Sequence, residues 1–313
     1  MSMFEGMFEI FNEKDSGSET EISRPASSTQ PSYSPPSNVF VVSVGGSILM
    51  DGKPSSEAIL AVSSCLNELI RNGHKLVLVV GGGKIARDYV NAAKALGANN
   101  FELDELGIRI TRANASLLLS SIETAHPEVL TDVKQSAEIL AQGKTPVYGG
   151  LMPGFTTDAV AALLAEYLNA TFINLSNVEG IFTADPAAHP SARLYHELGY
   201  GRLLEILISN AMKPSQNLIL DLPAAMILKR SSLTALFLSG HNLENFKAAV
   251  QGLSFTGTVV RPDASELLEG DEEEDLLAKK PSPRRKAAKR KAKKKKTARF
   301  EDEEELDPDK IEF

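Results

Sequence analysis

The chain is nearly devoid of cysteine and has no long apolar run. Cys65 is the only cysteine among 313 residues, so no disulfide can form within one chain, and a reducing compartment is expected. No segment approaches the roughly 18 consecutive apolar residues of a membrane span. The first residues also lack the basic-then-apolar order of a signal peptide. These absences favour a cytoplasmic protein with no membrane partner.

Three common phosphate-binding signatures are absent as well. No G-x-G-x-x-G follows the first apolar segment, no G-x-x-x-x-G-K-[ST] occurs anywhere, and the protein-kinase signature set is missing. The five histidines are scattered without the spacing of metal ligands, so no metal site made of histidines is predicted. Any phosphate chemistry must therefore rest on another kind of fold.

The net charge of −8 is unevenly distributed along the chain. Residues 38–262 carry 19 acids and 17 bases, a near balance that argues against a broad nucleic-acid-binding face. Residues 284–299 hold eleven bases and no acid, between acidic runs at 271–275 and 301–305. This basic block predicts weak, salt-sensitive nucleic-acid binding, which the acidic runs oppose.

Composition divides the chain into three parts. Residues 1–37 are acidic and include a segment rich in Ser, Pro and Thr, and residues 263–313 are mostly charged blocks. Neither part has the apolar content to build a core, so both are expected to be disordered. The folded unit is predicted to span 38–262.

Within 38–262, apolar segments of strand length alternate with segments of helical period. Strands are expected at Val39–Val44, Leu76–Val80, Pro146–Tyr148, Thr171–Leu175 and Ala235–Leu238. Helices are expected at 55–72, 84–97, 111–124, 132–142, 157–168, 223–231 and 242–252. This alternation predicts an α/β fold with a mostly parallel sheet covered on both sides.

Glycines follow three of the expected strands, at 45–46, 81–83 and 149–150. Ligands in parallel α/β folds bind at the carboxyl ends of strands, where glycine lets backbone N–H groups approach an anion. One such loop is equally well explained by a sharp turn. Three loops together, one of them followed by Lys84 and Arg87, indicate phosphate binding. Two loops on neighbouring strands are suited to hold two phosphorylated ligands facing each other.

Five longer motifs occur in a characteristic order. They are Val44-Gly-Gly-Ser47, Gly81-Gly-Gly-Lys-Ile-Ala-Arg87, Ile110-Thr-Arg-Ala-Asn-Ala115, Pro153-Gly-Phe-Thr-Thr-Asp-Ala-Val-Ala-Ala162 and Asn177-Val-Glu-Gly-Ile-Phe-Thr-Ala-Asp-Pro186. Over about 38–262 the chain thereby resembles the amino-acid-kinase superfamily, and within it the uridylate kinases of the archaeal type. The run after Pro153 and the Thr-Ala-Asp-Pro segment are the specific parts of this resemblance.

The resemblance implies a fold, a reaction and an assembly. The fold is a three-layer αβα sandwich whose N-terminal half binds the acceptor and whose C-terminal half binds ATP. The implied reaction transfers the γ-phosphoryl group of ATP to UMP, giving UDP and ADP in pyrimidine nucleotide biosynthesis. Mg²⁺ is the implied cofactor and a homohexamer the implied assembly.

Matching positions also imply roles for particular residues. Gly45 and Gly46 would line the transferring phosphate, and Asp221 matches an acid that orients the catalytic lysine or the phosphate contacts. The implied UMP-binding residues are Gly82, Gly83, Arg87, Thr111, Thr157 and Asp158. The implied ATP-binding residues are Ser47, Asn177, Gly180, Phe182, Asp185 and Pro186.

One departure from the family pattern concerns catalysis. Many members have a lysine two residues before the first glycine pair, and this chain has Ser43 there. Phosphoryl transfer depends on positioning and on cations that stabilise the developing charge, so another cation must act. Lys84 is the first candidate, Lys213 the second and Lys53 the third.

Three acidic residues also have purely structural explanations. Asp158 falls in the first turn of a helix, where the helix dipole favours an acid without any ligand. Asp221 precedes Leu-Pro-Ala-Ala and is suited to cap a helix, and Asp185-Pro186 is a turn initiator by itself. Their place within the ordered motifs favours the functional roles, least strongly for Asp221.

Three other functions stay open at this point. The same fold could act on a carboxylate or carbamate acceptor, although Arg87 with Lys84 favours a dianionic phosphate. A nucleotide-binding protein that has lost catalysis is compatible with the missing lysine. A nucleic-acid-associated protein would instead use residues 284–299.

Overall fold

The structure is a computed structural model that describes residues 33–50, 52–186, 188–211 and 219–262. Most of the two segments expected to be disordered, the basic block 284–299 and Lys213 lie outside the described residues. The predictions made for them are therefore not tested by the fold.

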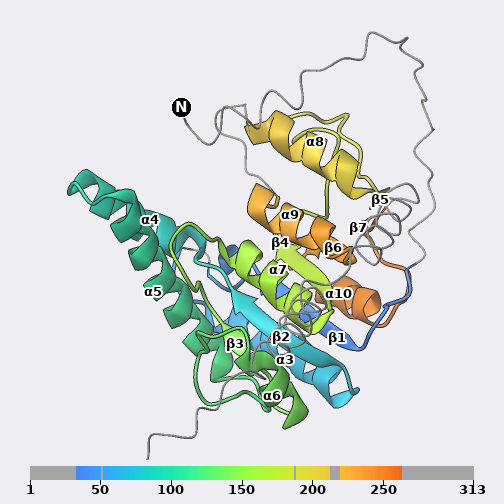
Figure 1. The fold of residues 1–313 in the computed structure, drawn as a ribbon, viewed down its shortest axis with the longest axis horizontal. Helices are drawn as coiled ribbons and strands as arrows, with labels where there is room; N and C mark the ends of the chain where they lie inside the picture. The colour runs from blue at the N-terminus through green and yellow to red at the C-terminus, as the bar shows by residue number, and fades with distance from the viewer. Residues whose placement is uncertain (1–32, 51, 187, 212–218, 263–313) are drawn as a thin grey trace, which may run out of the picture. The chain divides into compact units, whose positions relative to one another are not determined.

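The described chain is built around one seven-stranded sheet (Figure 1). Its strands, in spatial order, are β3 (Val147–Tyr148), β2 (Lys75–Val80), β1 (Val39–Val44), β4 (Thr171–Ser176), β6 (Ala235–Ser239), β7 (Thr258–Val260) and β5 (Glu197–Leu198). All neighbouring pairs are parallel except β6 and β7. The mostly parallel sheet predicted from the sequence is confirmed.

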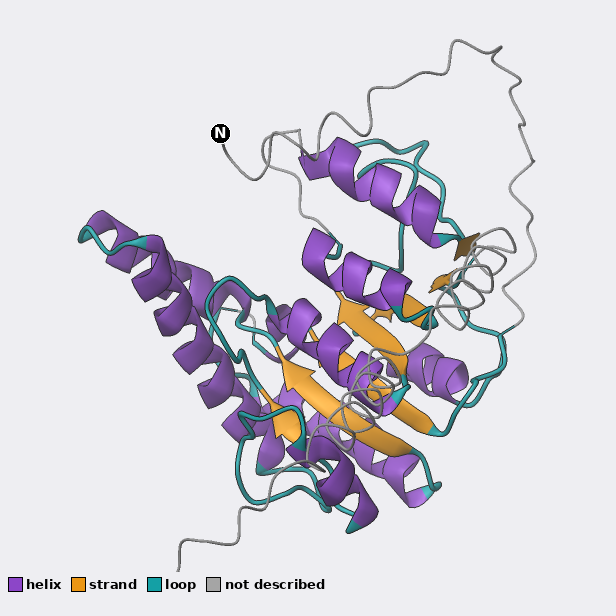
Figure 2. Ribbon diagram, viewed as in Figure 1, coloured by secondary structure: helices purple, strands orange, loops and turns teal. Residues whose placement is uncertain are grey.

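Helices cover both faces of this sheet (Figure 2). Their bounds are α2 (Gly46–Leu49), α3 (Ser56–Arg71), α4 (Gly83–Ala95), α5 (Asn100–Leu119), α6 (Gln135–Ala141), α7 (Thr157–Leu168), α8 (Tyr200–Ala211), α9 (Leu222–Arg230) and α10 (Leu243–Val250). One core lies between the sheet and α3 and α10, and the other lies between the sheet and α7, α8 and α9. This is the three-layer αβα sandwich that the resemblance implies.

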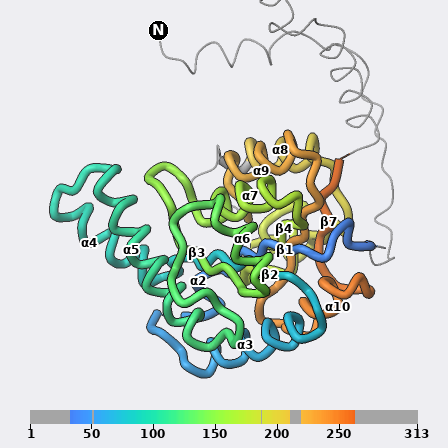
Figure 3. The backbone as a smooth tube through the Cα atoms, turned by 60° about the horizontal axis from the view of Figure 1, so that its bottom comes forward, coloured from blue at the N-terminus to red at the C-terminus, as the bar shows by residue number. Residues whose placement is uncertain are grey.

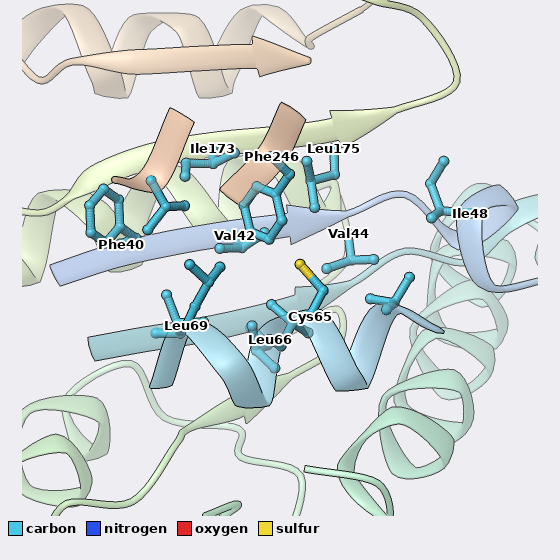
Figure 4. Packing of buried hydrophobic residues seen from close by; sticks show 14 of the residues in the cluster. Phe40, Val42, Val44, Ile48, Cys65, Leu66, Leu69, Ile173, Leu175 and Phe246 are labelled. Carbon is cyan, nitrogen blue, oxygen red and sulfur yellow. The ribbon is translucent and has the colours of Figure 1, made fainter. Parts of the chain in front are cut away.

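The central strand β1 shows how the sequence builds the two cores. Phe40, Val42 and Val44 point to one face and pack with Cys65 and Leu66 of α3 (Figure 4). Val41 belongs to the opposite core. Ser43 shares that opposite side of the strand, so a polar residue stands where the alternation would place another apolar one.

Several elements differ from the sequence prediction. The short strands β5 and β7 and the helices α2 and α8 were not predicted, and α5 begins at Asn100 rather than at 111. The signal for the true start of α5 is a capping box, in which Asn99 and Glu102 bond each other's backbone N–H groups. A helix beginning at 111 omits the first three turns of α5.

The packed unit also begins earlier than residue 38. Tyr33 is buried, its ring meets Phe255 edge-on at a centroid distance of 6.4 Å, and its hydroxyl lies 3.2 Å from Thr171 Oγ1. The Ser/Pro-rich composition around Tyr33 concealed this contact, because one aromatic residue is enough to anchor a segment.

Replacing Tyr33 by alanine is therefore expected to destabilise the fold by about 3 kcal/mol, since a buried aromatic side chain is lost. Urea unfolding of the full-length protein measures this. Tyr89→Ala is the matched control, because Tyr89 is 54% exposed on α4 and should cost little. Equal losses in the two variants would show that residues before 38 do not belong to the core.

The helices α4 and α5 lie side by side at one end of the sheet (Figure 3). No residue of α4 is buried, whereas α5 buries Leu103, Ile108 and Leu118.

Among the described residues, no helix is both long enough and apolar enough to cross a membrane.

Candidate active site

The first two glycine loops touch each other at the carboxyl ends of β1 and β2. The N–H group of Gly81 donates to the Val44 carbonyl oxygen at 2.9 Å. A Cβ atom on Gly46 would lie only 2.2 Å from the backbone nitrogen of Gly83, and Gly83 itself has a φ of +63°. Only glycine permits this approach, so the two loops are held next to each other.

Helix α5 fixes the second glycine loop from the side. The Asn114 side chain donates from Nδ2 to the carbonyl oxygens of Gly81 and Gly82, at 2.9 and 3.2 Å. Asn114 is buried, so these bonds are shielded from water. The Gly81 N–H group is engaged with Val44, whereas the N–H groups of Gly82 and Gly83 have no backbone acceptor among the described residues and are suited to bind an anion.

The same helix holds the third glycine loop. Thr111 Oγ1 accepts a hydrogen bond from the Gly150 N–H group and donates to the Ile108 carbonyl oxygen, each at 2.7 Å. Arg112 donates from Nε and Nη2 to the carbonyl oxygens of Gly150 and Leu151, at 3.0 and 3.3 Å. The Thr-Arg-x-Asn motif therefore joins two loops, and its threonine hydroxyl is already engaged within the protein.

A cavity of about 450 Å³ opens between α4, α5 and the start of α7. Its size suits a nucleotide or another ligand of similar volume. Five of the six residues predicted to bind UMP line it, namely Gly82, Gly83, Arg87, Thr111 and Thr157. The structure thus brings together residues that are up to 75 positions apart in the sequence.

Arg87 and Asp104 are the charged residues that line the cavity, and Arg87 lies near the start of α4. No hydrogen bond or ion pair to another described residue engages the Arg87 guanidinium group. The N-terminus of α4, at Gly82 and Gly83, adds the partial positive charge of a helix start. A free guanidinium group beside unpaired N–H groups is suited to bind a phosphate.

Other cavity residues were not predicted. Leu103, Asp104 and Ile108 come from the first turns of α5, which the sequence prediction left out. Asp104 Oδ2 accepts a hydrogen bond from the Gly154 N–H group at 2.8 Å and so ties the turn before α7 to α5. Recognition of the capping box at Asn99 would have brought these residues into the site.

Asp158, the sixth residue predicted to bind UMP, does not line the cavity. It is partly buried beside Thr157, and its Oδ1 atom accepts hydrogen bonds from Ser43 Oγ at 2.6 Å and Asn174 Nδ2 at 3.1 Å. Burial raises the pKa of this carboxyl group from 3.8 to about 6, and the nearby charge of Asp221 adds to the rise, which the two hydrogen bonds oppose.

Asp221 has a structural role in the fold. Its Oδ1 atom accepts from the Ala224 N–H group at 2.9 Å and caps α9, and its Oδ2 atom accepts from the Thr156 hydroxyl. Thr156 in turn caps α7 through the Ala159 N–H group, at 3.1 Å. Asp221 therefore joins the starts of α7 and α9, and the role implied for it in catalysis stays a prediction.

The raised pKa of Asp158 predicts how its replacement changes stability. The Asp158 carboxyl group loses its proton at a lower pH in the unfolded chain than in the folded protein. The folded protein therefore loses stability as pH rises from about 4 to about 6. Asp158→Asn removes this cost and should stabilise the ligand-free protein by about 2 kcal/mol at pH 7.5. The gain should vanish below pH 4.

Urea unfolding at several pH values measures this difference. Asp88→Asn is the matched control, because Asp88 is exposed on α4 and its replacement should change stability little. An Asp158→Asn protein no more stable than the parent at pH 7.5 would contradict a raised pKa.

The residues assigned to ATP lie on the other side of the first glycine loop. Ser47 Oγ donates to Asn177 Oδ1 at 3.1 Å, which brings these two together at the ends of β1 and β4. The segment after β4 contains three more of these residues, Phe182, Asp185 and Pro186. An isolated antiparallel β-bridge joins Phe182 to Leu194 within this segment.

Gly180 begins that segment against β7, next to Thr258. A Cβ atom there would lie 2.6 Å from Thr258 Oγ1, so packing alone accounts for this glycine. The ATP contacts predicted for Gly180, Phe182, Asp185 and Pro186 stay predictions.

The candidate cations are separated in the fold. Lys84 follows Gly83 and extends over the turn at Gly52, where a Cβ atom would lie 3.8 Å from its Nζ. Lys53 is exposed in that same turn. Lys213 lies outside the described residues. Of these three lysines, Lys84 is the one that directly follows a residue of the paired glycine loops.

This fold and this paired-loop site define the class of protein. Residues 38–239 match the model of the amino acid kinase family, and the chain belongs to that family. Its relatives include a uridylate kinase of Methanococcoides burtonii, 42% identical over 207 residues, which are 64% of this chain and 86% of the relative. A uridylate kinase of Natronomonas pharaonis is 39% identical over 228 residues, 72% of this chain and 99% of the relative.

Solved structures agree with this placement. The crystal structure of uridylate kinase from Archaeoglobus fulgidus is similar with a TM-score of 0.63 and 39% identity, covering 71% of this chain and 99% of the other. A UMP kinase from Bacillus anthracis, at 19% identity and a TM-score of 0.62, shares the fold.

Proposed function

We infer that this chain is a uridylate kinase, which transfers the γ-phosphoryl group of ATP to UMP. An oxygen of the UMP phosphate attacks the γ-phosphorus, the bond from that phosphorus to the β–γ bridging oxygen breaks, and UDP and ADP leave. The relatives named uridylate kinase match over nearly their whole length and about 70% of this chain, and they support this assignment.

The observation that carries the proposal is the contact between the two glycine loops. An acceptor phosphate on Gly82, Gly83 and Arg87 lies next to a donor phosphate on Gly45 and Gly46, because the loops themselves touch. Positioning of this kind supplies much of the acceleration of phosphoryl transfer, which needs little covalent help from the protein.

The charge of the cavity favours a phosphate acceptor over a carboxylate. Arg87 and the N-terminus of α4 act together on one end of the cavity, which suits a dianion better than a single carboxylate. The apolar side chains of Val90, Leu103 and Ile108 line the same cavity and are suited to contact a planar base.

Mg²⁺ fits this site as an ion carried by the nucleotide. Among the described residues, no group of three His, Cys, Asp or Glu side chains could hold a metal ion by itself. Mg²⁺ commonly binds substrate phosphates with few protein ligands, so this finding is compatible with it. The ion would be held mainly by the nucleotide phosphates, whose charge it would neutralise.

Calorimetric titration of the full-length protein with UMP, without ATP, tests the acceptor site. We expect UMP to bind and N-acetylglutamate, a carboxylate acceptor, not to bind. Tight binding of N-acetylglutamate with none of UMP would reject the proposed acceptor.

The proposed assembly is a homohexamer, as the family resemblance implies. Light scattering during gel filtration should give six times the mass of the 33.7 kDa chain. A monomer at the concentrations used for activity measurements would reject this part of the proposal.

A further inference from the structure

Two buried polar residues on neighbouring strands point at one carboxylate oxygen. Ser43 of β1 and Asn174 of β4 are direct partners in the parallel ladder, and their side chains are 3% and 4% exposed. Both donate to Oδ1 of Asp158, from Ser43 Oγ at 2.6 Å and from Asn174 Nδ2 at 3.1 Å. Strand register, rather than proximity in sequence, creates this arrangement.

The arrangement does not serve the stability of the core. Asn174 Oδ1 is buried and has no hydrogen-bond partner among the described residues, because the amide is turned to present Nδ2 to Asp158. A buried acceptor left unpaired costs about 1–3 kcal/mol. Val41 and Phe172, two positions before Ser43 and Asn174 and on the same face of the sheet, are buried apolar residues of that core, so valine or leucine at these positions would match their surroundings. Features that reduce stability in this way are concentrated at functional sites.

Asp158 has no cationic partner among the described residues. The charged group acting on it is Asp221 at the start of α9, and β1 and β4 supply only the two neutral donors. Since both donors bind Oδ1, the Oδ2 atom is left for groups that arrive with the substrates. Asp158 itself does not line the acceptor cavity, but it follows Thr157, which does.

We propose that Ser43 and Asn174 are positioning residues for phosphoryl transfer, which hold the Asp158 carboxylate so that Oδ2 faces the reacting phosphates. A carboxylate there is repelled by phosphates unless a cation lies between them, so Oδ2 orients a cationic group of the loaded site. Neither residue touches a substrate in this account. The inference rests on the proposed kinase activity.

Four full-length variants test this proposal: Ser43→Ala, Ser43→Thr, Asn174→Leu and Asn174→Ala. Ser43→Ala and Asn174→Leu should each lower kcat about tenfold or more, because misplaced groups lose much of the benefit of positioning. The KM values for UMP and ATP should change less than threefold. Ser43→Thr keeps the hydroxyl and should regain most of kcat.

The stability of the variants separates positioning from folding. Asn174→Leu removes the unpaired oxygen and should unfold at the same or a higher urea concentration than the parent. Asn174→Ala, which introduces no bulk, serves as the second variant if leucine does not fit. A loss of kcat that merely follows a loss of folded protein in all four variants would overturn the proposal.

A titration of the Asp158 carboxyl carbon by NMR gives a readout that is independent of activity. Each hydrogen bond favours the ionised carboxylate, so removing the donor of Ser43 or of Asn174 should shift the titration midpoint of Asp158 to higher pH. The acid limb of the pH profile of kcat should shift in the same direction. An unchanged midpoint in Ser43→Ala would overturn the proposal even in an active enzyme. A shifted midpoint in a protein that never phosphorylates UMP would instead reject the kinase assignment and leave the contact intact.

Discussion

Arg87→Ala is expected to raise the UMP concentration for half-maximal rate about fiftyfold while changing the ATP requirement less than twofold. Arg87 lines the cavity proposed for the acceptor and is expected to contact that ligand only, so its loss should remove a charge-assisted contact of about 2–3 kcal/mol. Steady-state kinetics with each substrate varied in turn measures both requirements. The expected split locates the acceptor in the cavity between α4, α5 and α7.

Arg109→Ala is the matched control for this experiment. Its side chain is 74% exposed on α5 and lies 3.7 Å from Glu105, so its removal should leave both requirements unchanged. A defect confined to ATP in the Arg87→Ala enzyme would place the acceptor elsewhere.

Lys84→Met is expected to lower kcat at least about a hundredfold, which corresponds to the loss of one cationic contact made in the transition state. Lys84 is the second residue of α4 and follows Gly83, whose backbone approaches Gly46, and Ser43 stands where the family resemblance implies a lysine. Rapid-quench measurement of a single turnover separates the chemical step from product release.

Two other lysines calibrate the Lys84 result. Lys53→Met should retain nearly the full rate, and Lys213→Met should show a milder loss than Lys84→Met. Near-normal turnover in Lys84→Met together with a large loss in Lys213→Met would reverse the assignment.

Much of the architecture was predictable because its strands are buried on both faces. Runs such as Val39–Val44 and Leu76–Val80 are too apolar to be anything but central strands, and glycine marks their carboxyl ends. The strands β5 and β7 have two and three residues, too few to show a periodicity, and no glycine pair follows them as it follows the equally short β3. Tyr33 was missed because its partners, Thr171 and Phe255, are distant in sequence.

The site was predictable where loops form it and unpredictable where packing forms it. Glycine loops followed by Lys84 and Arg87 carry a local chemical signal, and the family motifs located Thr111 and Thr157. No local pattern links Ser43 to Asn174, because only the register of β1 against β4 pairs them. Thr111 illustrates a further limit, since its hydroxyl is engaged with Gly150 and Ile108 rather than left free.

The most direct test of the central claim is the choice of acceptor. Full-length protein is supplied with ATP, Mg²⁺ and one acceptor at a time, namely UMP, CMP, AMP, N-acetylglutamate or carbamate, and ADP release is measured. The account predicts the highest kcat/KM with UMP by a wide margin, with UDP and ADP formed in equal amounts. Equal turnover of UMP and AMP, preference for a carboxylate or carbamate, or no release above the acceptor-free rate would contradict it.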